Sequence, residues 1–80
     1  MSKFDKVLKR FMSKPKDFTW DELTFLLKNL GFNLITGSGS RRKFIKGDIV
    51  LILHEPHPQK TILVCYIKET LNTLKKEGLI

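Results

Sequence analysis

Apolar residues recur at helical spacing in the first part of the chain. One set predicts a helix that ends at Pro15, and its buried stripe would consist of Phe4, Val7, Leu8 and Phe11. A second helix is expected after Thr19, because Thr19 and Glu22 have the spacing of a capping box. Gly31 is suited to end that helix, whose stripe would consist of Leu23, Leu26, Leu27 and Leu30.

A third helix is predicted near the end of the chain. It would begin between Leu63 and Cys65 and end at Gly78, with a buried stripe formed by Val64, Ile67, Leu71 and Leu74. Cys65 lies within this apolar region, so we expect a small buried side chain there rather than a nucleophile.

The spacing of apolar residues changes from helical to alternating between the second and third helices. Strands are expected at residues 32–35, 42–46 and 49–53, with a flexible turn at 37–40 and a tight turn at Gly47-Asp48. Gly before Asp favours a type II′ turn over type I′. Because short turns join consecutive strands, the sheet should be antiparallel.

The last predicted strand is a continuous apolar run, which is typical of a strand covered on both faces. One alternating set, Ile49, Leu51 and Leu53, can face the main helices. The other set, Val50 and Ile52, would need cover from the first helix or from another chain.

The expected fold class is therefore α+β, with the order α-β-β-β-α and a three-stranded antiparallel sheet that carries both helices on one face. Residues 1–18 would add a basic N-terminal helix and a linker, and residues 19–80 would form the main domain. Eighty residues suffice for one core and leave little room for a deep pocket with a large cofactor.

The net charge of the chain indicates which class of molecule it binds. Fifteen Lys and Arg residues against eight Asp and Glu give a net charge of +7, and the excess is concentrated in residues 1–16 and 36–48. Two separate basic patches favour a polyanion such as nucleic acid. The basic first helix could instead contact a membrane surface or another protein.

The location expected from the sequence is the cytoplasm. A lone cysteine cannot form an internal disulfide and suits a reducing compartment. The chain has no apolar run long enough to cross a membrane and no apolar segment typical of a secretory signal.

The region around residues 37–46 carries the clearest candidate chemistry. A Gly-Ser-Gly-Ser turn lets backbone N–H groups approach a phosphate, and the three basic residues that follow add charge. The residues predicted to contact RNA are Ser40, Arg41, Arg42, Lys43 and Lys60. Phe44 could stack on a base, but burial in the core is the favoured interpretation.

Two histidines in the segment 54–58 suggest a second site. Without an obvious third ligand, His54 and His57 do not predict a metal site, and no cofactor is expected. Either histidine could act as a general base that deprotonates a ribose 2′-hydroxyl. The alternative is a loop histidine with no chemical role.

Several segments, read in order, resemble the HicA family. These are Trp20-Asp-Glu-Leu, Leu-Gly-Phe32, Gly37-Ser-Gly-Ser-Arg-Arg-Lys-Phe44, His54-Glu-Pro-His-Pro58 and Lys-Lys-Glu-Gly-Leu79. The resemblance covers about residues 19–79 and leaves the first helix outside it. It implies the fold of double-stranded-RNA-binding domains, in agreement with the order predicted above.

The resemblance also implies a function. HicA proteins are toxins of toxin–antitoxin pairs that bind and cleave messenger RNA without a metal, and a HicB-type antitoxin neutralises them. Their catalytic histidine typically follows a Gly-Ser pair, where this chain has Arg41 in a Gly-Ser-Gly-Ser-Arg variant. A guanidinium stays protonated, so any base would be His57 or His54, with Arg41 stabilising the charge that develops on the phosphate.

The sequence leaves two alternatives each for the docking position of an antitoxin and for the activity of the chain. An antitoxin could cover either the face that carries Val50 and Ile52 or the basic turn, and an acidic antitoxin would be attracted to a basic toxin. The chain could also be a non-catalytic RNA-binding domain of the same fold, in which case it would bind RNA without cutting it.

Overall fold

The computed structural model describes residues 2–56 and 59–80 and contains three helices and three strands. They are α1 (Lys3–Met12), α2 (Trp20–Asn29), β1 (Asn33–Thr36), β2 (Arg41–Lys46), β3 (Ile49–His54) and α3 (Val64–Lys76). The predicted α+β class and element order are confirmed. No helix in these residues is long and apolar enough to cross a membrane.

The capping box predicted at the start of α2 is present. The Thr19 side chain accepts a hydrogen bond from the Glu22 amide at 3.2 Å, and the Thr19 amide donates to a Glu22 carboxylate oxygen at 3.1 Å. At the other end, Gly31 has a φ of +99°, so it takes the left-handed conformation that ends the helix. Both boundaries of α2 therefore follow from local chemistry.

A two-residue turn sets the register of the sheet. Lys46 pairs with Ile49 across Gly47-Asp48, and the strand order is β1-β2-β3 with both pairs antiparallel. Gly47 has a φ of +58°, whereas Asp48 is not among the residues of positive φ. Type I′ would need a positive φ at both positions, so it is excluded, and the two φ values agree with the predicted type II′ turn.

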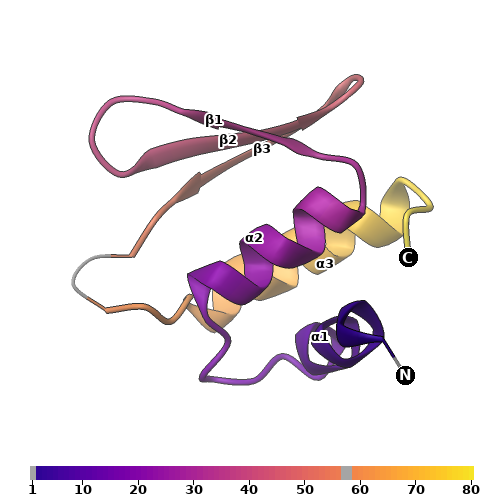
Figure 1. Cartoon of the computed structure of the whole chain (residues 1–80). Helices are drawn as coiled ribbons and strands as arrows, with labels where there is room; N and C mark the ends of the chain where they lie inside the picture. The colour runs from indigo at the N-terminus through magenta and orange to yellow at the C-terminus, as the bar shows by residue number, and fades with distance from the viewer. Residues whose placement is uncertain (1, 57–58) are drawn as a thin grey trace.

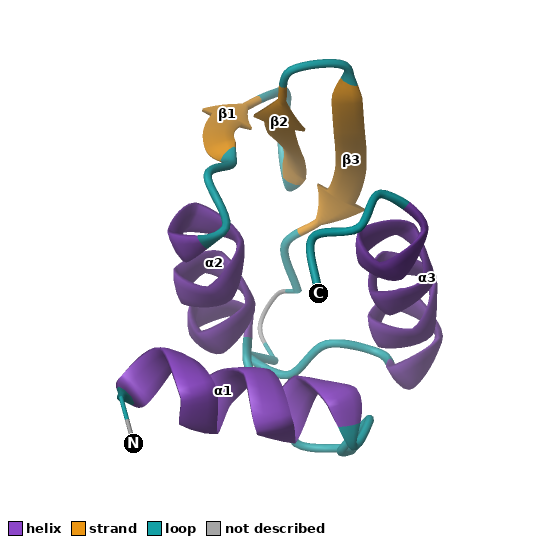
Figure 2. Cartoon of the chain, turned by 90° about the vertical axis from the view of Figure 1, so that its right-hand side faces the viewer, coloured by secondary structure: helices purple, strands orange, loops and turns teal. Residues whose placement is uncertain are grey.

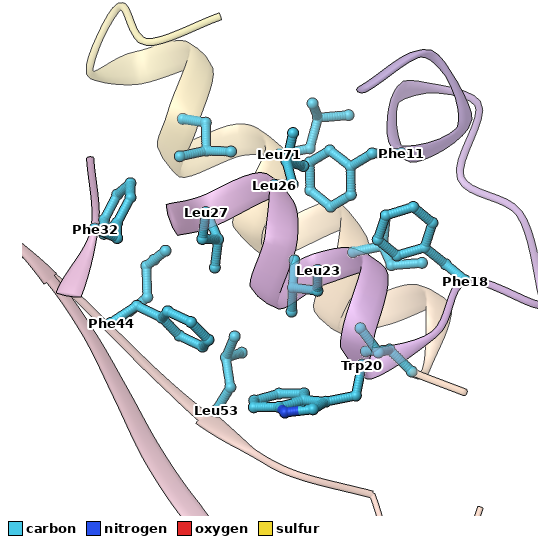
Figure 3. Close-up of a cluster of buried hydrophobic side chains, with 14 of the residues drawn as sticks. Phe11, Phe18, Trp20, Leu23, Leu26, Leu27, Phe32, Phe44, Leu53 and Leu71 are labelled. Carbon is cyan, nitrogen blue, oxygen red and sulfur yellow. The ribbon is translucent and has the colours of Figure 1, made fainter. Parts of the chain in front are cut away.

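Helices α2 and α3 cover one face of the sheet, as Figures 1 and 2 show. The core between them is centred on Phe44, which is fully buried, with its ring centroid 5.7 Å from that of Trp20 (Figure 3). The interpretation of Phe44 and Trp20 as packing residues is confirmed. Burial of Phe44 places Arg42 and Lys46 toward the helices as well, because strand side chains alternate.

Helix α1 lies on the far side of α2 and α3, away from the sheet (Figures 1 and 2). Its apolar stripe packs into the same core, with Val7 and Phe11 buried. The expectation that this helix could cover the second face of the sheet is therefore wrong. Val50 and Ile52 remain 50% and 48% exposed, because α1 buries its stripe against the other helices.

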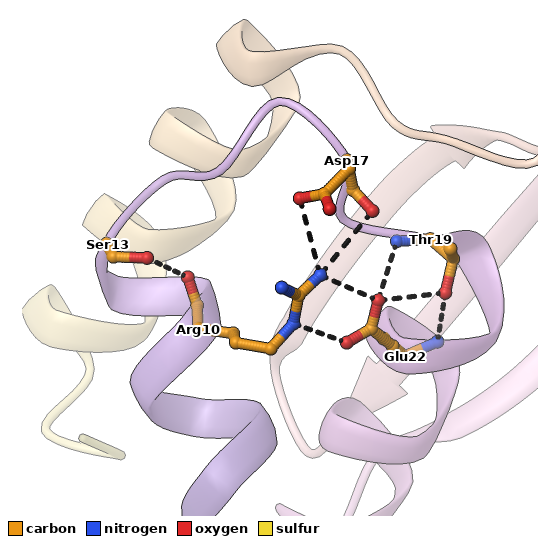
Figure 4. Close-up of polar contacts among 5 residues, drawn as sticks. All are labelled: Arg10, Ser13, Asp17, Thr19 and Glu22. Atoms are coloured by element: carbon orange, nitrogen blue, oxygen red, sulfur yellow. Dashed lines mark hydrogen bonds and ion pairs between the residues drawn. The ribbon is translucent and has the colours of Figure 1, made fainter.

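Ionic contacts hold α1 against the cap of α2 (Figure 4). The Arg10 guanidinium donates to both carboxylate oxygens of Glu22, at 2.8 and 3.2 Å, and also contacts Asp17. Burial by itself would raise the pKa of Glu22, but hydrogen bonds from Arg10 and Thr19 outweigh it and lower that pKa below its usual value. The hydrogen bond to Glu22 raises the pKa of Arg10.

Cys65 is exposed, so the expectation that it is buried was wrong. The buried positions of α3 are Ile67, Thr70, Leu71 and Leu74. Successive helical residues are rotated by about 100°, which turns Cys65 away from the core side that Ile67 and Leu71 occupy.

Candidate nucleic-acid interface

The sheet face opposite the helices carries a mixture of apolar and basic side chains and no carboxylate. Alternation along the strands and the observed register place these residues on it: Asn33, Ile35, Arg41, Lys43, Ile45, Val50, Ile52 and His54. We call this set the open sheet face. Arg41 and Lys43 are exposed there, and neither forms an ion pair with any described residue.

The glycine-rich turn projects from one end of this face. Gly39 has a φ of +59°, and the Gly37 amide donates to the Arg41 carbonyl at 2.8 Å. A side chain on Gly37 would meet the same carbonyl at 3.3 Å, so the turn is tight at that point. Within the described chain the amides of Ser38, Gly39 and Ser40 have no hydrogen-bond acceptor, and successive free N–H groups suit an anion.

Arg42 faces the opposite way from its two basic neighbours and supports the turn from beneath. Its guanidinium donates to the Gly39 and Arg41 carbonyls at 2.8 and 2.9 Å and pairs with Glu55 at 3.2 Å. Only 19% of the side chain is exposed. The geometry gives Arg42 a role in shaping the turn, while contact between Arg42 and RNA stays a prediction.

His54 on β3 is the register partner of Arg41 on the neighbouring strand β2. Its Nδ1 lies 3.4 Å from Ser40 Oγ, and the Glu55 amide donates to the Ser40 carbonyl at 2.8 Å. The imidazole is exposed and therefore open to a substrate. The structure thus brings three predicted site residues together, namely Ser40, Arg41 and His54. The other candidate base, His57, lies outside the described residues.

Lys60, the last predicted RNA contact, lies on the segment that returns toward α3. Its carbonyl accepts a hydrogen bond from the Trp20 amide at 2.8 Å, which fixes the backbone and leaves the side chain exposed. Lys60 lines a small cavity of about 120 Å³ together with Glu55, which also lines a cavity of about 320 Å³ beside Ser40 and Arg42. Lys60 and the turn therefore border the same end of the sheet.

Sequence reasoning missed the role of Glu55 and the meeting of Arg41 with His54. The second could have been found by counting residues. A two-residue turn at 47–48 pairs residue 46 with 49, and the same ladder then pairs 41 with 54. Nothing in the sequence pattern indicated that Glu55 would form an ion pair with Arg42, because that contact depends on the direction of both side chains.

No group of three His, Cys, Asp or Glu side chains gathers within residues 2–56 and 59–80 in a way that could hold a metal ion. The candidate site on the described surface groups cations, backbone amides, a serine hydroxyl and an imidazole.

Comparison with known proteins agrees with this arrangement. The family model described as the HicA toxin of bacterial toxin–antitoxin systems matches residues 20–78, which include every strand and exclude α1. No curated protein and no solved structure matches the chain with statistical significance. The match covers most of the chain, so the protein belongs to the HicA toxin family.

Proposed function

We propose that this toxin binds messenger RNA in the cytoplasm through the glycine-rich turn and the adjacent part of the open sheet face. The observation that carries the proposal is the grouping of unpaired Arg41 and Lys43 beside Ser40, free turn amides and an exposed imidazole. Cations without acidic partners retain their attraction for phosphates. Lys60 extends the same surface, and Arg42 holds the turn in shape.

We further propose that the toxin cleaves the bound strand without a metal. In this step His54 removes the proton of a ribose 2′-hydroxyl, and the resulting oxygen attacks its own 3′-phosphate. The bond from phosphorus to the 5′-oxygen of the next nucleotide breaks, which leaves a 2′,3′-cyclic phosphate and a 5′-hydroxyl. The leaving oxygen takes a proton from water or from a second acid, for which His57 is the candidate.

Arg41 has a different part in the same step. Arginine side chains are poor general bases, so this part is not proton removal. Across the ladder from His54, Arg41 can place positive charge next to the phosphate as negative charge develops on the phosphate oxygens. Such preorganised charge is often the largest single contribution to lowering a barrier.

Membership of the family implies a HicB-type antitoxin partner. We propose that the antitoxin covers the open sheet face. Ile35, Val50 and Ile52 are each about half exposed there, and Lys43 stands between Ile35 and Ile52 in the register. A partner with an apolar centre and acidic rim would match both features. Such a partner would also cover Arg41 and His54. The two docking positions suggested by the sequence, the face with Val50 and Ile52 and the basic turn, would then belong to one interface.

A non-catalytic RNA-binding domain is the second candidate. The observation that favours it is Arg41, a residue that cannot act as a base, at the position where the family resemblance expects a histidine. Both candidates require RNA to bind at the turn. They differ in whether the strand is cut.

Expression in a bacterial host tests the proposed toxin activity directly. Induction of the wild-type chain should stop growth, and co-expression of the adjacent gene product should restore it. The Arg41→Gln, Lys43→Gln double variant should be harmless at equal protein level, whereas a Lys6→Gln, Lys9→Gln variant with the same change of charge should remain toxic. Harmless wild-type protein that also leaves RNA unbound would refute the proposal.

A further inference from the structure

A cavity of about 340 Å³ lies next to the candidate site, between the end of β3 and the beginning of α3. Its walls include Pro56, Leu63 and Tyr66 on the apolar side and His54 and Glu55 on the polar side. Small-ligand sites typically combine apolar and aromatic walls with a few polar groups that set orientation. The composition of this cavity therefore suits a flat ligand with polar edges.

The apolar wall of the cavity includes a large side chain that the core does not bury. Leu63 is 61% exposed, the largest value among the large apolar side chains in the described part of the chain. The preceding residue, Ile62, is 5% exposed and already anchors this segment in the core. Tyr66 packs partly against the core and also lines the cavity. Leu63 contributes little to the core and is available for a ligand.

His54 connects this cavity to the phosphate-binding turn. The imidazole lines the cavity, and its Nδ1 lies 3.4 Å from Ser40 Oγ. Glu55 lines both this cavity and the one formed by Gly39, Ser40 and Arg42. A ribose carries its base and its phosphate on one ring, so the base next to a phosphate at the turn can enter the cavity that His54 and Glu55 line.

We propose that this cavity is a nucleobase subsite, which takes the base of the nucleotide whose 2′-hydroxyl faces His54. The inference rests on the proposed function and adds a substrate class, namely single-stranded RNA with an unpaired base at the cleavage position. A base within a duplex is already paired and stacked, and it must leave the stack before it can contact Tyr66 and Leu63.

Glu55 adds a preference among bases. One of its carboxylate oxygens pairs with Arg42, and the second accepts no hydrogen bond from the described residues. A carboxylate only accepts hydrogen bonds, so it favours a base that presents an amino group. Uracil has one donor, its ring N3–H, whereas guanine presents an amino group beside a ring N–H on the same edge, so the subsite should prefer guanine over uracil.

The test compares RNA binding by the wild-type chain with binding by Leu63→Ser and Tyr66→Ala variants. The probes are a short labelled single-stranded RNA, the same strand with one abasic ribose at the mapped contact position, and the corresponding duplex. Met12→Ser is the matched control, because Met12 is 44% exposed on α1 and lies outside the site. Thermal unfolding of each variant, together with Tyr66→Phe, separates loss of the stacking wall from loss of folding.

Removing one stacked base or its aromatic platform should weaken binding roughly 5- to 150-fold. The wild-type and Met12→Ser proteins should bind the abasic strand more weakly than the intact strand. Leu63→Ser and Tyr66→Ala should lose that discrimination, whereas Tyr66→Phe should keep it. Leu63→Ser and Tyr66→Ala should bind the duplex as the wild-type chain does, because the duplex offers no unpaired base and leaves only the phosphate contacts.

Each contrary outcome has a distinct meaning. If the wild-type chain binds intact and abasic strands equally and still depends on Arg41 and Lys43, the subsite is wrong and the proposed function stands. If the two substitutions leave RNA binding unchanged and weaken only association with the antitoxin, the cavity belongs to the protein interface and the inference fails. If the wild-type chain binds no RNA, the proposed function fails and the subsite fails with it.

Discussion

Replacing Arg41 and Lys43 together by glutamine should reduce the salt dependence of RNA binding more than any comparable change elsewhere. Both side chains are exposed on the open sheet face, and neither is paired with a carboxylate of the described chain. Their substitution removes two charges without touching the core, because the buried Phe44, which follows Lys43, faces the opposite side of the strand.

The magnitude follows from counterion release. Each phosphate neutralised on a single strand contributes about 0.7 to the slope of log affinity against log salt. Four contacts, from Arg41, Arg42, Lys43 and Lys60, give a slope near −3, and loss of two contacts reduces it to about −1.4. If Arg42 is occupied by Glu55, both values are smaller in magnitude, but their difference of about 1.4 is unchanged.

Fluorescence anisotropy with labelled single-stranded RNA at several salt concentrations measures both slopes. Lys6→Gln with Lys9→Gln is the matched control on α1, since both double variants lower the net charge from +7 to +5 (7 − 2). This control should retain the wild-type slope. An equal loss of slope in the two double variants would show that net charge, rather than the open sheet face, governs binding and would refute the reasoning.

Three further predictions concern the fold. The pKa of Glu22 is lower in the folded state, so its ion pair with Arg10 stabilises the fold above the unfolded pKa of about 4.3, and this contribution is lost as pH falls through the folded value. Glu22→Gln should therefore be less stable than wild type at pH 7, and the difference should shrink as pH falls through the folded pKa of Glu22, as judged by urea unfolding; a constant difference would contradict this. Cys65 should react with a thiol reagent in the native protein at one equivalent per chain, whereas a need for denaturant would mean that it is buried. Phe44→Ala should cost about 3–5 kcal/mol of the roughly 4–12 kcal/mol expected for a domain of this size, while Val50→Thr on the open sheet face should cost under about 1 kcal/mol. Similar losses for the two variants in urea unfolding would show that the two faces of the sheet are not distinguished as described.

Local chemistry made much of the fold predictable. Thr19 with Glu22 defined the start of α2, and Gly31 defined its end, because capping depends on a few residues within one turn. The Gly47-Asp48 turn was predictable for the same reason, and it fixes the whole ladder between β2 and β3.

Features that depend on packing between distant segments were not predictable. The apolar run in β3 indicated cover on both faces, yet Val50 and Ile52 are half exposed, because α1 packs on the helices. The cavity beside Tyr66 likewise required the end of β3 and the start of α3 to meet. The exposed position of Cys65, by contrast, could have been predicted, because the expected stripe with Ile67, Leu71 and Leu74 already turns Cys65 away from the core.

The central claim is that RNA is cut without a metal and that His54 supplies the base. The most direct measurement is the rate of cleavage of single-stranded RNA in the presence of a chelator by wild type, His54→Gln and His57→Gln, with binding measured in parallel. Wild type should produce 2′,3′-cyclic phosphate ends, and His54→Gln should be about 10²- to 10⁴-fold slower while RNA affinity changes little. Cleavage by His54→Gln at the wild-type rate would contradict the claim, and intact RNA after incubation with wild type would leave only RNA binding.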